Sequence, residues 1–211
     1  AGPGGVSNNL LGWFVAGNIN GSDNDDVTTW ESSGVGTMIL ENQRPAYIPK
    51  LNKTNSNYLV NFNPTVRFTG TWANTIYMRS TTTHSSNPGS IYAGIKVLTS
   101  NRNGKFGWNA SMDYNGIHIT NLGTTNGWTL YASTLSDPRV ITPNTTNIVG
   151  GTWTNTPSNS RLISVDGAVT TNNLAPWIIT DYYGIGSDNN WSSGALDDLY
   201  GDNVVYGTDL S

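Results

Sequence analysis

The chain has 211 residues, and only 11% of them are Asp, Glu, Lys or Arg, less than half of the usual share. The net charge is −4 and no cluster of Lys or Arg is present, so the sequence lacks the basic surface that nucleic-acid binding requires. Cysteine is absent, which excludes disulfides, thiol catalysis and cysteine-ligated zinc. No apolar run approaches the roughly 20 residues of a membrane-spanning helix, and we expect no membrane insertion.

Short apolar runs alternate with turn-forming clusters of Asn, Gly, Ser and Thr along the chain, a pattern typical of short strands. The first expected strand covers residues 10–15, and a polar loop follows over residues 17–26. The remaining expected strands lie at residues 57–62, 65–68, 76–79, 92–98, 116–120, 128–132, 147–153, 161–165, 168–170, 183–186 and 204–206. No segment has the pattern of a helix.

The pair Asp166-Gly167 lies between two alternating apolar runs. A two-residue Asp-Gly loop is typical of a type I′ β-hairpin, because both central residues need φ > 0. Many short strands without helical crossovers favour antiparallel sheets, in a sandwich or a barrel. We therefore predict a single all-β domain over residues 1–211.

Three segments of the C-terminal third occur in a familiar order and spacing. Residues 160–167 read SRLISVDG, residues 183–186 read YGIG, and residues 194–199 read GALDDL. Together they resemble the hairpin and the two following strands of concanavalin A-like/LamG-type domains. The resemblance implies a jelly roll, a two-sheet antiparallel β-sandwich.

The N-terminal half is similar to one variant of these domains. Residues 3–6 read PGGV, and residues 61–70 read NFNPTVRFTG. The variant occurs in large exported bacterial proteins, often of Bacteroidota and the type IX secretion route, including adhesins and gliding-motility proteins. The resemblance implies a secreted or cell-surface location, a place within a larger multidomain chain, and contact with glycans or with surface and secretion proteins.

Carboxylate pairs are the first test for an enzyme. Retaining glycosidases need two carboxyl groups about 5 Å apart, and those of this sandwich type carry two Glu on one strand. The only glutamates here, Glu31 and Glu41, are ten positions apart. His118, with Tyr114 nearby, resembles part of the strand motif of alginate lyases, but the first residue of that motif differs. We therefore predict no catalysis, with a lyase as the next enzyme candidate.

Calcium is a candidate ligand, because Ca²⁺ takes six to eight oxygen ligands in flexible geometry. Asp23, Asp25 and Asp26 lie close together in a polar loop, and Asp188 belongs to a second oxygen-rich segment. The alternative is a solvated acidic loop that binds no ion.

Glycan binding needs exposed aromatic rings and polar partners, since a sugar's C–H face packs on a ring while its hydroxyl groups form hydrogen bonds. Trp108, Trp128 and Trp191 are flanked by Asn or Gly, as expected for loop tips. The predicted ligand-binding residues are Trp108, Asn109, Asp113, Trp128, Asn190 and Trp191. The alternative is that these tryptophans cover the open ends of the sandwich.

The sequence therefore predicts a non-catalytic recognition or adhesion module of an exported cell-surface protein, which binds carbohydrate or a partner protein with or without Ca²⁺. Two alternatives remain open. The first is a structural spacer or secretion-cargo domain with no ligand of its own, and the second is a polysaccharide lyase or glycoside hydrolase.

Overall fold

The computed structural model describes residues 8–34, 36–69, 76–85, 89–97, 104–108, 116–121, 126–131, 135–140, 142–155, 158–176, 180–186 and 197–207. The elements in these ranges are strands and one short 3-10 helix: β1 (Leu10–Val15), η2 (Ala16–Asn18), β2 (Thr29–Glu31), β3 (Ile39–Asn42), β4 (Lys50–Asn52), β5 (Thr65–Thr69), β6 (Tyr77–Ser85), β7 (Gly89–Val97), β8 (Gly104–Trp108), β9 (Gly116–Asn121), β10 (Asn126–Tyr131), β11 (Leu135–Val140), β12 (Thr146–Thr154), β13 (Ser160–Val165), β14 (Ala168–Asn172), β15 (Thr180–Gly186) and β16 (Asp197–Gly207). No helix in these ranges is long and apolar enough to cross a membrane.

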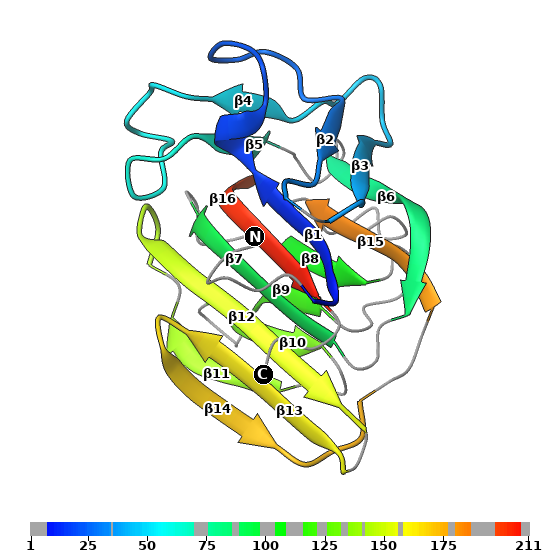
Figure 1. Cartoon of the computed structure of the whole chain (residues 1–211). Helices are drawn as coiled ribbons and strands as arrows, with labels where there is room; N and C mark the ends of the chain where they lie inside the picture. Colours follow the sequence, from blue (N-terminus) through cyan, green and yellow to red (C-terminus); the bar gives the residue numbers. More distant parts are fainter. Residues whose placement is uncertain are drawn as a thin grey trace.

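Two eight-stranded antiparallel sheets form a sandwich, which confirms the predicted fold class (Figure 1). The front sheet has the order β14-β13-β12-β7-β16-β5-β4, and β1 also pairs with β16. The back sheet has the order β11-β10-β9-β8-β15-β6-β3-β2. In the view of Figure 1, β9 and β10 of the back sheet lie behind the front sheet.

The longest strand, β16, holds the front sheet together. One of its edges pairs with β7, and its other edge is shared between β5 and β1. The pairs Leu10↔Gly207 and Val15↔Asn203 mark the two ends of the β1–β16 ladder. The first and last strands that the structure describes are therefore neighbours.

Alternate residues of the strands point into the space between the sheets, as expected for a strand with one buried face. In β7, residues Ile91, Ala93, Ile95 and Val97 are buried, whereas the residues between them are half-buried. Near β1 and β2 the core contains an edge-to-face pair of Phe14 and Trp30, with ring centroids 5.6 Å apart.

One charged side chain is also buried. Arg161 of β13 points inward with no exposed surface, and its Nε donates a hydrogen bond to Asn172 Oδ1 at 2.8 Å. Burial lowers the pKa of this guanidinium, because desolvation disfavours the charged form.

The Asp-Gly hairpin is confirmed. Asp166 and Gly167 have φ of 50° and 82°, and the flanking residues Val165 and Ala168 pair directly. The Asp166 carboxylate accepts hydrogen bonds from the Ile148 backbone N–H and from Asn147 Nδ2, both at 2.7 Å. The turn is thereby tied to β12.

The strand expected at residues 57–62 is wrong. Val60 and Asn63 pair across a tight turn, and the two residues between them, Asn61 and Phe62, have φ of 48° and 67°. Backbone in this left-handed region ends a strand. Phe62 lies at the tip of the turn with 94% of its surface exposed, so its apolar side chain did not indicate burial.

Five strands were not expected from the sequence: β2, β3, β4, β8 and β11. Three of them have only three or four residues, too few to show alternation. β8 contains two glycines and β11 contains Pro138, residue types that are depleted in strands.

The outer surface of the front sheet contains one contact that requires glycine. The Tyr92 ring lies over Gly150 on the neighbouring strand, and a Cβ atom on Gly150 would lie 2.0 Å from Tyr92 Cδ1. At Gly94, on the same surface, a Cβ atom would meet only Val60 Cγ1 at 3.6 Å, an ordinary contact.

We predict that Gly150→Ala lowers the free energy of unfolding by about 1–3 kcal/mol, the usual cost of overpacking. The matched variant Gly94→Ala should change it by less than about 1 kcal/mol. Urea denaturation of both variants measures the difference. Equal effects would show that the Tyr92 ring does not restrict position 150.

The core also predicts a response to alkaline pH. Burial raises the pKa of Tyr183 well above its ordinary value, so the folded chain retains a proton that the unfolded chain loses near pH 10. The unfolded state then binds fewer protons, and stability falls as pH rises above about 10. Urea midpoints between pH 9 and 11.5 should fall less steeply for Tyr183→Phe than for the unsubstituted chain. Parallel curves would contradict this assignment.

Candidate functional site

The outer face of the back sheet gathers polar and aromatic side chains where β6 and β15 pair. In β6, Met78 and Ser80 are buried, so Arg79 between them faces outward. In β15, Tyr183 and Ile185 are buried, so Tyr182 and Gly184 belong to the same outer face.

A β-bulge sets how these residues meet. Tyr182 pairs with Thr83, but Gly184 pairs with Arg79, so β6 has two extra residues in this stretch. The buried Ser80 hydroxyl accepts a hydrogen bond from the Tyr183 backbone N–H at 2.9 Å and donates one to Thr82 O at 2.7 Å. These bonds satisfy polar groups that the bulge removes from the ladder.

The guanidinium of Arg79 lies over the ring of Tyr182, with Cζ 4.0 Å from the ring centroid. Its Nε is buried without a hydrogen-bond partner, and it forms no ion pair with any described residue. Stacking on a ring leaves the N–H donors in the guanidinium plane available. Glu41 pairs with Arg79 from β3, on the side away from Tyr182.

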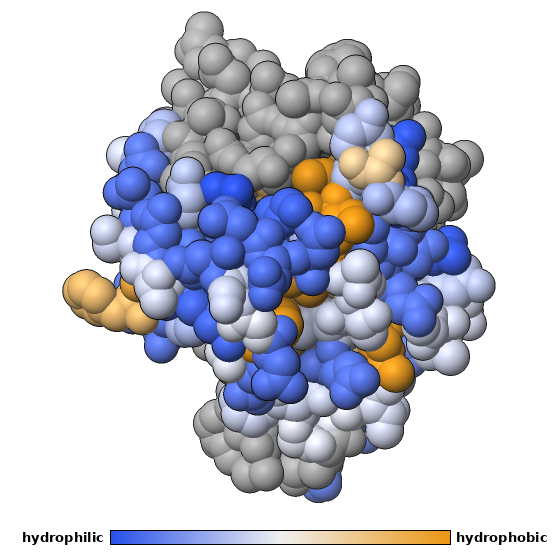
Figure 2. Space-filling model, turned by 90° about the horizontal axis from the view of Figure 1, so that it is seen from above, coloured by the Kyte–Doolittle hydropathy of each residue, from blue (hydrophilic) through white to orange (hydrophobic). Residues whose placement is uncertain are grey.

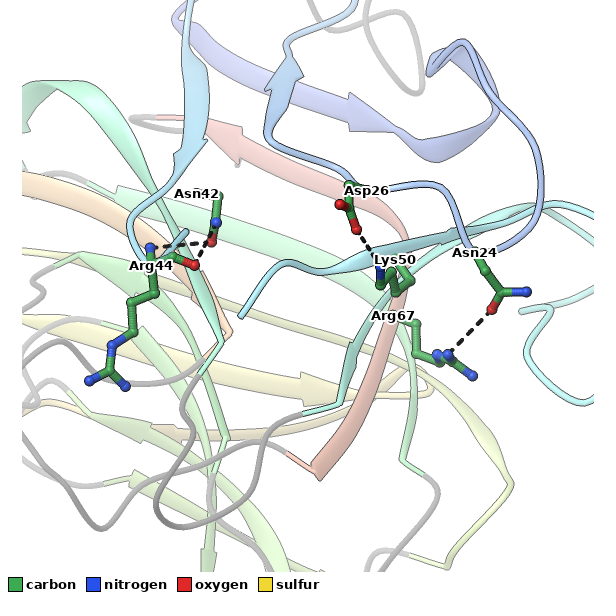
Figure 3. A network of polar contacts seen from close by, with 6 residues as sticks. All are labelled: Asn24, Asp26, Asn42, Arg44, Lys50 and Arg67. Atoms are coloured by element: carbon green, nitrogen blue, oxygen red, sulfur yellow. Dashed lines mark hydrogen bonds and ion pairs between the residues drawn. The ribbon is translucent and has the colours of Figure 1, made fainter. Parts of the chain in front are cut away.

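Tyr77 lies two residues before Arg79 on the same face. Burial raises the pKa of its hydroxyl, and the positive charges of Arg79 and Arg44 oppose that rise. Arg44 is positioned by a turn in which Asn42 exchanges two hydrogen bonds with its backbone (Figure 3). We call Arg79, Tyr182, Tyr77 and Glu41 the arginine–tyrosine patch.

A row of glycines continues from this patch across the sheet. Gly184 pairs with Gly107 of β8, and Gly107 pairs with Gly116 of β9. A Cβ atom on Gly184 would meet only Met78 O, at 3.6 Å, so the absent side chain leaves open space. With strands about 4.8 Å apart, the row extends about 14 Å from Arg79.

A hollow lies at one end of the sandwich, between η2 and β2. Its volume is about 470 Å³, within the range of small-molecule sites. Trp30 lines it with its indole N–H buried and unpartnered. The other lining residues are Val15, Asn18, Ile19, Asn20, Thr29, Glu31, Ser32, Ser33 and Gly34. The surface at the top of the molecule, seen in Figure 2, is mostly hydrophilic.

In the acidic loop predicted to hold calcium, Asp carboxylates accept hydrogen bonds from neighbouring protein groups. Asp23 accepts hydrogen bonds from the Thr54 hydroxyl and from the backbone N–H groups of Lys53 and Thr54. These bonds, led by that from the Thr54 hydroxyl, lower the pKa of Asp23. Asp25 accepts from Ser22 N at 2.8 Å.

Asp26 forms an ion pair with Lys50, and Arg67 Nη2 donates to Asn24 Oδ1 at 3.5 Å (Figure 3). The three carboxylates of the loop thus have three different sets of partners. Within the described residues, no group of three or more His, Asp or Glu side chains is arranged to hold a metal ion. Asp188 lies outside those residues, and the calcium site stays a prediction.

Of the predicted glycan-binding residues, Trp108 and Trp128 are in described strands, and Asn109, Asp113, Asn190 and Trp191 lie outside the described residues. Trp108 ends β8, but Trp128 lies within β10 and not at a loop tip. Trp128 pairs with Ile119, which pairs with Gly104, four residues from Trp108. The two tryptophans are therefore about 13 Å apart along the strand direction, and their role stays a prediction.

The sequence did not predict the arginine–tyrosine patch, nor that Glu31 and Glu41 lie on the same face of a hairpin. Thr29 pairs with Glu41 and Ile39 pairs with Glu31, so the hairpin of β2 and β3 places the only two glutamates on one exposed face. Alternation around the buried Trp30 and Leu40 was the signal that could have revealed this placement.

Comparison of the sequence with protein families and with curated proteins found no match. Among solved structures, part of a Trypanosoma rangeli sialidase aligns over 98% of this chain, with 14% identity and a TM-score of 0.50. The chain spans 32% of the length of that sialidase. This likeness supports the sandwich fold alone.

Two carbohydrate-binding domains also align, with lower TM-scores. The Emp47p carbohydrate recognition domain is 10% identical, with a TM-score of 0.47 over 80% of this chain and all of that domain. The CBM66 module of Bacillus subtilis is 10% identical, with a TM-score of 0.37 over 94% of each chain.

Proposed function

We propose that the chain is a non-catalytic carbohydrate-recognition module of an exported cell-surface protein, and that it binds glycan on the outer face of the back sheet. The observation that carries this proposal is the stack of Arg79 on Tyr182 beside the glycine row. Fold alone does not determine function, so the proposal rests on the chemistry of this face.

The patch combines the two kinds of contact that sugars make. An aromatic ring packs against the C–H groups of a sugar, and planar N–H donors bind its hydroxyl groups. Gly184, Gly107 and Gly116 add a strip without side chains, along which an extended oligosaccharide can approach the backbone.

Composition and resemblance support the exported setting. The chain has few charged residues and no cysteine, and its sequence segments resemble domains of large exported bacterial proteins. A module of this kind holds its parent protein on a glycan-coated surface.

The proposal predicts that Tyr182→Ala weakens glycan binding about tenfold, because it removes both the ring and the support of Arg79. Affinity electrophoresis against a panel of alginate, polygalacturonate, β-glucan and xylan measures the effect. Tyr58→Ala is the matched control, since Arg67 of β5 in the front sheet stacks on Tyr58, in the loop before β5, with Cζ 4.5 Å from the ring centroid.

Equal loss of affinity in the two variants would show that the glycan-binding site does not lie at the arginine–tyrosine patch. No retardation of the unsubstituted chain by any polysaccharide would favour the alternative of a spacer or secretion-cargo domain.

A glycoside hydrolase is the second candidate, because Glu31 and Glu41 share one exposed face. Residues in this diagonal relation have Cβ atoms up to about 8 Å apart, and carboxyl groups of inverting glycosidases lie about 6.5–9.5 Å apart. The test is release of reducing ends from the same polysaccharides. If the unsubstituted chain releases them and Glu31→Gln and Glu41→Gln do not, the function is hydrolysis and not recognition alone. The lyase alternative rests on His118 of β9 and on Tyr114, which lies outside the described residues.

A further inference from the structure

We propose that the arginine–tyrosine patch selects saccharides that bear a carboxylate, and that Arg79 is the residue that binds this group. The inference rests on the proposed function, and it adds the chemical class of the ligand.

The first support is the uncompensated charge of Arg79. Its side chain is half-buried, with Nε buried and unpartnered, and it forms no hydrogen bond or ion pair within the described part of the chain. Three other cations among the described residues have oxygen partners. Lys50 pairs with Asp26, Lys96 Nζ donates to Asn57 O at 2.8 Å, and Arg67 donates to Asn24. A partly buried cation without an anion is costly, so a ligand anion would stabilise it.

The second support is the distribution of charge around Arg79. Glu41 is its register partner, but the two groups do not form an ion pair, because the guanidinium lies toward β15 over Tyr182. Asp181 uses Oδ1 to accept the Tyr182 backbone N–H at 2.7 Å. Arg44 adds a second positive charge near Tyr77. The side of Arg79 that faces the glycine row therefore has no described carboxylate in contact with it.

The third support is geometric. A guanidinium stacked on a ring is held in one plane, and its two terminal nitrogens match the two oxygens of a carboxylate. The neighbouring position on β15 is Gly184, where no side chain fills the space beside the guanidinium. A carboxylate on a pyranose ring can therefore reach Arg79 while the ring lies over the glycine row.

The experiment compares a polyuronate, its carboxyl-reduced form and dextran sulfate as probes, by affinity electrophoresis and calorimetry. The unsubstituted chain should bind the polyuronate at least about tenfold more tightly than the carboxyl-reduced polymer, as expected for loss of a charged hydrogen-bonded contact. Arg79→Gln should bind both at the level of the reduced polymer, and the control Arg67→Gln should retain the preference. Arg79→Lys keeps the positive charge but lacks the planar guanidinium, so its preference for the polyuronate over the reduced polymer should be intermediate. This variant replaces Arg79→Gln in the test if Arg79→Gln does not fold.

Equal binding of the polyuronate and its reduced form would overturn the inference and leave the proposed function intact. Binding of dextran sulfate as tight as that of the polyuronate would also overturn it, since the patch would then attract any polyanion. No binding of these probes or of any neutral polysaccharide would instead contradict the proposed function itself.

Discussion

Burial of every second residue between two sheets is the constraint on which the remaining structure depends. It directs Met78, Ser80, Tyr183 and Ile185 inward, and Arg79 with its neighbours outward. A shift of one residue in either strand would exchange the two sets. The alternation is interrupted at the bulge of β6, where residues 81–83 are all exposed and the buried Ser80 bonds to both strands. The functional face is thus a consequence of core packing.

Much of the fold could be predicted because its signals are local. Alternation located β1, β7, β12 and β13, and the Asp166-Gly167 pair located a hairpin. The errors arose where local signals were ambiguous. Residues 57–62 look like a strand, but left-handed backbone at Asn61 and Phe62 makes them a turn. The short strands β2 and β3, at one end of the back sheet, owe their pairing to tertiary contacts.

The candidate site could not be predicted, since its parts are distant in sequence. Arg79 and Tyr182 are brought together by sheet pairing, and the contact of the adjacent Ser80 with Tyr183 spans 103 positions. The glycine row likewise combines three strands whose order in the sheet differs from their order in the chain. Local sequence patterns instead indicated tryptophans and an acidic loop as candidate sites, because these residue types stand out within a short segment.

The pairing of β1 with β16 has a mechanical consequence. Leu10, at the start of the first strand, lies opposite Gly207, at the end of the last. Tension applied through the chain on either side of the domain would therefore pull on the same end of one antiparallel ladder. Its hydrogen bonds would break one after another, as in a zipper, and would not share the load. Under such a load β1 would separate from β16 at low force while β12, β13 and β14 stay paired.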